Sequence, residues 1–310
     1  MSGPALGAPA ARRLALKVDC DTFLGTRDGV PNLLRALDAR RIRATFFFTL
    51  GPDRSGRAIV RVFTRKGFLR KMLRSRALSL YGPRTALSGT LLPAPMIGSR
   101  LAGSIAAVAA AGHEVGVHAW DHVRWHDKLD RLTEAQIAAD YGRAHDEFAR
   151  IFGHRARASA APGWHATGAS LAVQERFDLL YASDTRGDTP FYPEAGGARF
   201  RTIQLPTTLP TWDETYNSPE IPDDASCIAY YWRAIGGTEI HSIHTEVEGT
   251  ALLALFERQL DAWIADGVAF VTLEEIAREW LATPDRVPVR RIVRRELPGR
   301  AGLITASVPV

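Results

Sequence analysis

Two short motifs place carboxylates and imidazoles at spacings suited to binding a metal ion. Asp19 and Asp21 lie two residues apart in VDCDTF, and His118 and His122 lie four apart in HAWDH. After a strand, side chains two apart point to the same side, and two imidazoles four apart can reach one ion from a turn or a helix start. One carboxylate and two imidazoles leave coordination positions open for water and substrate, which is typical of a catalytic divalent metal.

Such a site predicts hydrolysis of an acyl–nitrogen bond. A divalent ion lowers the pKa of a bound water and polarises a carbonyl oxygen. The carboxylate that does not bind the ion can take the proton of the water, and a histidine on the opposite side can protonate the leaving amine. His244, in TEIHSIH, is the candidate for that second role. These ligand types accept zinc, cobalt, manganese or nickel, so they leave the metal open.

Each motif also has a less specific interpretation. Nearby aspartates commonly cap a helix, an HxxxH pair often occurs by coincidence, and a single histidine is more often a hydrogen-bonded core residue. All three groups, however, fall at the ends of predicted strands, where α/β proteins gather their chemistry. This shared position favours the functional interpretation.

The elements that must position these residues alternate along the chain. Strands are predicted at 14–19, 43–49, 114–120, 157–161, 179–183, 201–205, 238–244 and 267–273. Helices are predicted at 30–40, 100–111, 133–153, 168–176, 225–236, 249–266 and 273–282. The alternation predicts an α/β fold with a parallel sheet covered by helices, either open or closed into a barrel.

Composition is that of a globular protein of 310 residues, with 46% hydrophobic and 24% charged residues. Two cysteines are too few for a disulfide framework and suit a reducing compartment. The first 19 residues lack the uninterrupted apolar run of a secretory signal, and no stretch approaches the roughly 18–20 apolar residues of a spanning helix. We therefore expect a cytoplasmic protein.

One region is strongly basic. Residues 54–113 contain eleven Lys and Arg and no Asp or Glu. Within it, 66–82 fits an amphipathic helix, and Arg70, Lys71 and Arg74 are predicted to contact an anionic membrane surface. A helix that packs on the body with a solvated basic face is the alternative. Nucleic-acid binding is less favoured, because aliphatic rather than aromatic residues accompany the charges.

VDCDTF, HAWDH and SIHTEVEG resemble the motifs of the polysaccharide deacetylases, also called the NodB-homology or carbohydrate esterase family 4 enzymes. The resemblance implies a distorted parallel (β/α) barrel of about seven strands that carries the basic amphipathic insertion. It also implies Asp19 as the base and Asp21, His118 and His122 as ligands of one divalent ion, with zinc the first expectation. His244 matches the catalytic acid.

Longer segments narrow the resemblance within the family. DCDTFLGTRDGVP, HEVGVHAWDH and LPTTLPTWDE are similar to the branch that deformylates 4-deoxy-4-formamido-L-arabinose carried on undecaprenyl phosphate, over roughly residues 14–280. This implies a role in lipid A modification and polymyxin resistance, with peripheral attachment to the cytoplasmic face of the inner membrane. N-deacetylation of peptidoglycan or another amino-sugar glycan is the alternative, and a binding module without activity is a third.

The resemblance implies a flexible N-terminus at 1–13, a catalytic domain at 14–283 with its insertion at about 54–99, and a basic C-terminal tail at 284–310. Trp164, Trp212 and Glu246 are predicted to contact substrate.

The third family motif departs from its pattern, because SAAPGWH (159–165) lacks the usual Arg. Another residue must then support the base, and Asp184 and Arg186 are candidates.

Overall fold

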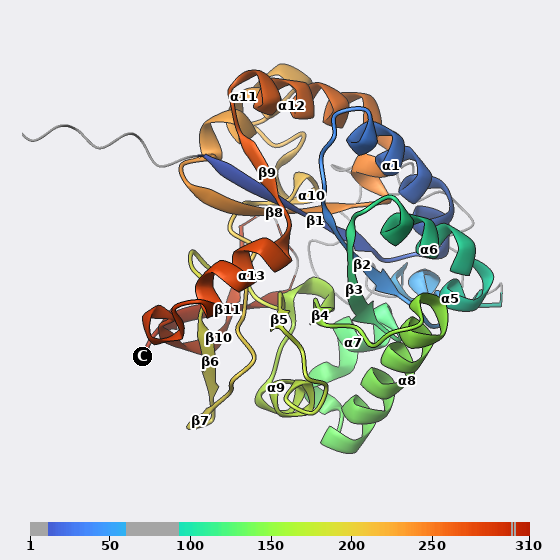
Figure 1. Cartoon of the computed structure of the whole chain (residues 1–310), viewed down its shortest axis with the longest axis vertical. Helices are drawn as coiled ribbons and strands as arrows, with labels where there is room; N and C mark the ends of the chain where they lie inside the picture. The colour runs from blue at the N-terminus through green and yellow to red at the C-terminus, as the bar shows by residue number, and fades with distance from the viewer. Residues whose placement is uncertain (1–11, 60–92, 299, 301) are drawn as a thin grey trace, which may run out of the picture.

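The computed structural model describes residues 12–298, apart from 60–92, together with 300 and 302–310. Its centre is a seven-stranded parallel sheet that curls into a distorted barrel with helices outside it (Figure 1). The strands are β1 (Arg13–Cys20), β2 (Thr45–Thr49), β3 (Glu114–Ala119), β4 (Ala158–Ser159), β5 (Tyr181–Ala182), β8 (Thr238–His244) and β9 (Ala269–Val271). The predicted parallel barrel is therefore confirmed.

β1 is the central strand, and its two faces have different tasks. Leu14, Leu16, Val18 and Cys20 are fully buried in the core beneath the helices. The alternate residues Ala15, Lys17 and Asp19 point to the inner face, because successive side chains of a strand alternate between faces. A buried lysine and a buried aspartate therefore lie inside the barrel.

Register brings the strand ends together. The sheet runs in the order β5-β4-β3-β2-β1-β8, and β9 also pairs with β1. Asp19 lies opposite Phe47 on β2 and opposite His244 on β8, and Lys17 lies opposite Ser242. All these pairs are parallel, so the carboxyl ends of the strands share one edge.

An irregular segment lies between β5 and β8 in space and hydrogen-bonds to both strands. The amide of Ala182 donates to the carbonyl of Ile203, and the amide of Thr208 donates to the carbonyl of Ile240. Residues 201–205, predicted as a strand, form isolated bridges instead. Pro206 lacks the amide donor that a continued ladder requires.

Helices cover the outside of the sheet. They are α1 (Val30–Asp38), α5 (Ile97–Arg100), α6 (Ala102–Ala110), α7 (His122–Lys128), α8 (Glu134–Phe152), α9 (Gly168–Gln174), α10 (Trp212–Thr215), α11 (Asp224–Ala234), α12 (Leu253–Ala265) and α13 (Leu273–Leu281). α8 matches its predicted range closely: Thr133 caps its start through the amide of Gln136, and Gly153 ends it with φ 75°.

A second sheet lies beside the barrel. It contains β6 (Tyr192–Ala195), β7 (Ala198–Arg199), β10 (Val289–Glu296) and β11 (Leu303–Pro309) in the order β11-β10-β6-β7. Most of the segment predicted as a basic tail thus forms β10 and β11. Ile304 and Ala306 of β11 are fully buried against Trp164.

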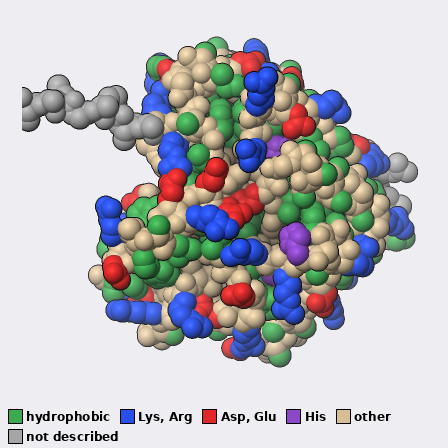
Figure 2. Space-filling view, in the orientation of Figure 1, with side chains coloured by type: hydrophobic (Ala, Val, Ile, Leu, Met, Phe, Trp, Pro, Cys, Tyr) green, Lys and Arg blue, Asp and Glu red, His purple; other side chains and the backbone are tan. Residues whose placement is uncertain are grey.

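The predicted membrane contacts Arg70, Lys71 and Arg74 lie outside the described residues. Among the residues that are described, no helix is long and apolar enough to cross a membrane. On the face shown in Figure 2, described Lys and Arg side chains are interspersed with Asp and Glu.

Candidate active site

The three predicted metal ligands converge at the carboxyl edge of the sheet. Asp21 directly follows β1, His118 lies near the end of β3, and His122 begins α7, which Asp121 caps by accepting from the amide of Arg124. Nε2 of His118 is 3.1 Å from Oδ1 of Asp21, and Nε2 of His122 is 3.3 Å from Oδ2. One donor atom from each residue can be chosen so that all three lie within 4.8 Å of one another.

The chemistry of this triad fits a divalent cation. Burial favours a raised pKa for Asp21, but the charges and hydrogen bonds of His122 and His118 hold that pKa well below its ordinary value. Oδ1 of Asp21 is buried, and it faces Nε2 of His118 across 3.1 Å. A carboxylate and two imidazole nitrogens that face one point make the donor set of a catalytic metal site.

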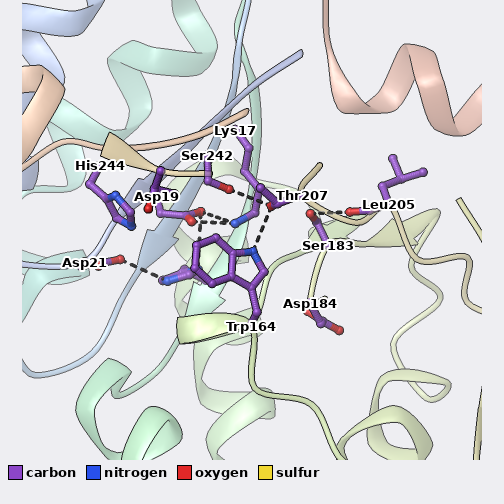
Figure 3. A network of polar contacts seen from close by, with 12 residues as sticks. Lys17, Asp19, Asp21, Trp164, Ser183, Asp184, Leu205, Thr207, Ser242 and His244 are labelled. Carbon is purple, nitrogen blue, oxygen red and sulfur yellow. Dashed lines mark hydrogen bonds and ion pairs between the residues drawn. The ribbon is translucent and has the colours of Figure 1, made fainter. Parts of the chain in front are cut away.

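Asp19 is held by a lysine on its own strand. Nζ of Lys17 lies 2.9 Å from Oδ1 and 2.6 Å from Oδ2 of Asp19 (Figure 3). Both side chains are almost fully buried. Oδ1 of Asp19 is also 3.9 Å from Nδ1 of His118, beyond hydrogen-bond distance. Asp19 is therefore fixed beside the triad by Lys17.

Lys17 is the functional residue that sequence reasoning missed. The available signal was a lysine inside an apolar strand, two positions before the predicted base. Lys17 supplies the cation next to Asp19 that the third motif lacks. Of the two candidates for this support, Asp184 accepts from Gln174 and Gln204, and Arg186 pairs with Glu214. Within the described chain, neither candidate forms a hydrogen bond or ion pair with Asp19.

His244 stands beside Asp19 because the two are register partners on adjacent strands (Figure 3). Its backbone amide donates to Oε2 of Glu248 at 2.8 Å. Burial alone favours a lower pKa for His244, but the negative charges of Asp21, Asp213, Glu248 and Asp19 raise it to about 9. At this pKa, His244 carries a proton at neutral pH when no metal ion is bound beside it.

The glycine-containing loop that follows Asp21 interlocks with the loop that follows β8. A Cβ at Gly25 would lie 2.0 Å from Oε1 of Glu246, and one at Gly29 would lie 2.1 Å from the carbonyl oxygen of Thr245. Glu246 accepts from the amide and hydroxyl of Thr22 at 2.8 and 2.7 Å. Burial, followed by the charge of Asp21, raises the pKa of Glu246 to about 7. This geometry favours a role in joining the loops, and a substrate contact by Glu246 stays a prediction.

The two predicted tryptophan contacts differ in position. Trp164 lies at the site, 5.8 Å from Nζ of Lys17, and its Nε1 donates to Thr207 at 2.9 Å. Trp212 is fully buried in the main core, next to Tyr231 and Phe256. The location of Trp212 favours a packing role over contact with a sugar.

The fold and the site define a metal-dependent amide hydrolase of the (β/α)-barrel class. Residues 8–182 match the family model "Polysaccharide deacetylase", and the chain belongs to this family. The resemblance that the motifs indicated is thus confirmed.

Two relatives extend the similarity over nearly the whole chain. A Shewanella sediminis protein named "Probable 4-deoxy-4-formamido-L-arabinose-phosphoundecaprenol deformylase ArnD" is 38% identical over 94% of each chain. A Wigglesworthia glossinidia brevipalpis protein of the same name is 32% identical over 91% of this chain and 97% of its own. A Mycobacterium smegmatis structure assigned to the polysaccharide deacetylases has a TM-score of 0.62 at 19% identity, covering 96% of this chain and 98% of its own. That structure supports the fold alone.

Proposed function

We propose that this protein hydrolyses the formamide of 4-deoxy-4-formamido-L-arabinose carried on undecaprenyl phosphate, as the names of its relatives indicate. The observation that carries the proposal is the buried Lys17–Asp19 pair beside the Asp21, His118 and His122 triad. A lectin-like module would need the ligands, but it would not need a second carboxylate fixed next to them. The product would be the free amino sugar used in lipid A modification, which lowers the negative charge that polymyxin recognises.

Each residue has a separate task in this reaction. A divalent ion held by Asp21, His118 and His122 would polarise the formamide carbonyl and lower the pKa of an adjacent water. Asp19, held by Lys17, takes the proton of the attacking water. His244 gives its proton to the departing nitrogen, because an unprotonated nitrogen is a poor leaving group. Zinc suits the ligand set, and cobalt, manganese and nickel are alternatives that metal analysis separates.

A lipid-linked substrate keeps the sugar at a membrane surface, so we extend the proposal to peripheral attachment at the cytoplasmic face of the inner membrane. The basic segment that contains Arg70, Lys71 and Arg74 is the candidate contact, at about 1 kcal/mol for each basic residue near anionic lipid. Flotation with anionic liposomes should decrease strongly when these three residues become Glu. Equal flotation of the variant and the wild type would contradict attachment through this segment.

Mass spectrometry of formamidoarabinose-phosphoundecaprenol, incubated with protein and zinc, tests the activity. The expected product lacks the elements of CO, because hydrogen replaces formyl. The N-acetyl analogue and an N-acetylated glycan oligomer, tested in parallel, provide the comparison for specificity. Hydrolysis of only the acetyl substrates would replace the deformylase proposal with a deacetylase.

A further inference from the structure

Two arginines from distant parts of the chain meet over one tryptophan ring. Arg186 follows β5, and Arg300 lies in the connection between β10 and β11. Their Cζ atoms are 4.7 and 4.6 Å from the centroid of the Trp164 ring. The exposed fractions of the two arginine side chains are only 7% and 12%.

The charges of this cluster do not balance. Nη1 of Arg186 is 3.1 Å from Oε2 of Glu214, and Nη1 of Arg300 is 3.5 Å from Oε1 of the same carboxylate. Within the described part of the chain, Glu214 is the only acidic partner of either guanidinium. One buried and one partly buried cation thus share one anion, although a charge removed from water is unfavourable unless it is paired. Among the described residues, the cluster therefore has one positive charge more than its acidic partner offsets.

This surplus charge lies close to the metal ligands. A Cβ at Gly163 would lie 2.3 Å from Cδ2 of His126 and 3.1 Å from Nη2 of Arg300. The ring of His126 is stacked 6.3 Å from that of His122. Nζ of Lys17, which holds the base, lies 5.8 Å from the centroid of the same Trp164 ring (Figure 3).

The backbone is strained where it brings these groups together. Trp164 has a positive φ of 49°, next to Gly163 at 63°. A bulky residue rarely adopts this conformation, and strain of this kind is concentrated at ligand sites. A side chain at Gly163 would enter the space that His126 and the guanidinium of Arg300 occupy against this turn.

We propose that Arg186 and Arg300, carried on Trp164, form an anion subsite that binds the phosphodiester of the lipid-linked sugar. The inference rests on the proposed function and adds the position of the phosphate to it. A phosphodiester carries one negative charge, which matches the surplus, and guanidinium groups bind phosphate oxygens in pairs. With nitrogen on C4, the arabinose ring can close only as a pyranose, so the formamide and the C1 phosphate lie at opposite ends of one ring. In this proposal, the sugar ring lies between the subsite and the triad.

The test compares a charged with an uncharged substrate. The first is formamidoarabinosyl phosphate esterified to a ten-carbon isoprenyl chain, and the second is the methyl glycoside of the same sugar. Arg300→Gln should lower kcat/KM at least tenfold for the phosphodiester, mainly through KM, and less than twofold for the glycoside. Arg295→Gln, an equal charge loss at an exposed position of β10, should change both values less than twofold.

A binding measurement separates this inference from the proposed function. Isothermal titration of the metal-free protein with the phosphodiester should show at least tenfold weaker binding in Arg300→Gln than in the wild type or Arg295→Gln. Equal binding by all three proteins, or equal kinetic losses on both substrates, would overturn the subsite while the deformylase activity stands. If the wild type binds the phosphodiester through Arg300 but does not hydrolyse either substrate, the proposed function fails and the subsite remains.

Discussion

The two ends of the barrel each hold a partly buried carboxyl group, and its pKa is shifted in opposite directions at the two ends. At the amino ends of the strands, Glu114 accepts from the hydroxyls of Thr45 and Tyr181 and from the amide of Glu274. All three donors are neutral, and burial raises the pKa of Glu114 to about 7. At the carboxyl ends, two histidines hold the pKa of Asp21 well below its ordinary value.

The difference shows that cationic partners, rather than depth, decide the state of a buried carboxyl group. β3 reaches both ends of the barrel. Glu114, which has neutral donors, is its first residue, and His118, a partner of Asp21, lies near its end. Neutral donors satisfy the oxygens of Glu114 but do not offset the cost of burying a charge. At the carboxyl end, the imidazoles of His118 and His122 do offset it for Asp21, which keeps this carboxylate available for metal binding.

Asp19→Asn is expected to give the largest effect. Removing the base should lower kcat by about 1,000-fold, within the range of general base catalysis. Formate release gives the rate, and the zinc content of the purified variant gives the state of the triad. Glu114→Gln is the matched control, because it changes a buried carboxyl at the opposite end and should retain activity. A fully active Asp19→Asn protein would show that Asp19 is not the base.

Lys17→Met tests whether the cation matters as much as the carboxylate. Leaving Asp19 without its partner should lower the free energy of unfolding by about 3–5 kcal/mol. Misplacement of the base should lower kcat on the order of 100-fold, with KM little changed. Lys17→Arg should recover most of both losses, as measured by urea unfolding and formate release. If Lys17→Met retained full kcat, Lys17 would be a structural residue alone.

The pH dependence of the stability of Glu114→Gln tests whether the carboxyl group at the amino end of the barrel has a raised pKa. The folded-state pKa of Glu114 is raised, so its protonated form stabilises the folded protein. This contribution to the free energy of unfolding is complete below about pH 4.5 and is lost as pH rises to about 7. The variant, which resembles the protonated acid, should therefore gain stability over the wild type by about 3 kcal/mol between pH 5 and pH 8. Urea unfolding at several pH values measures this difference. A difference independent of pH would contradict the raised pKa.

Tyr181→Phe is expected to have the smallest effect. It removes the donor 2.6 Å from Oε1 of Glu114 and should lower the free energy of unfolding by about 1 kcal/mol. The loss should be greater at pH 8 than at pH 5, because the ionised carboxylate depends more on its donors. Turnover should be unchanged, which formate release checks. A loss of turnover would mean that the two ends of the barrel are coupled.

Much of the fold and of the triad could be predicted from the sequence because both depend on local periodicity. The short, mostly apolar run 14–19 predicted a strand, and 133–153 predicted a helix, which Thr133 caps and Gly153 ends in the structure. The spacings of Asp19 with Asp21 and of His118 with His122 are set by the backbone within a few residues. Strand ends share one edge in any parallel sheet, so the two motifs could be expected to meet.

Contacts between distant segments depended on the tertiary structure. The pairing of His244 with Asp19 needs the β1–β8 register, and the meeting of Arg300 with Arg186 needs the second sheet to lie against Trp164. Lys17 was visible in the sequence. Only the structure showed that it is buried beside Phe47 and that the charge it offsets is that of the buried Asp19. Sequence spacing fixes the direction of a side chain along its own element, whereas sheet register and packing between elements fix what that side chain faces.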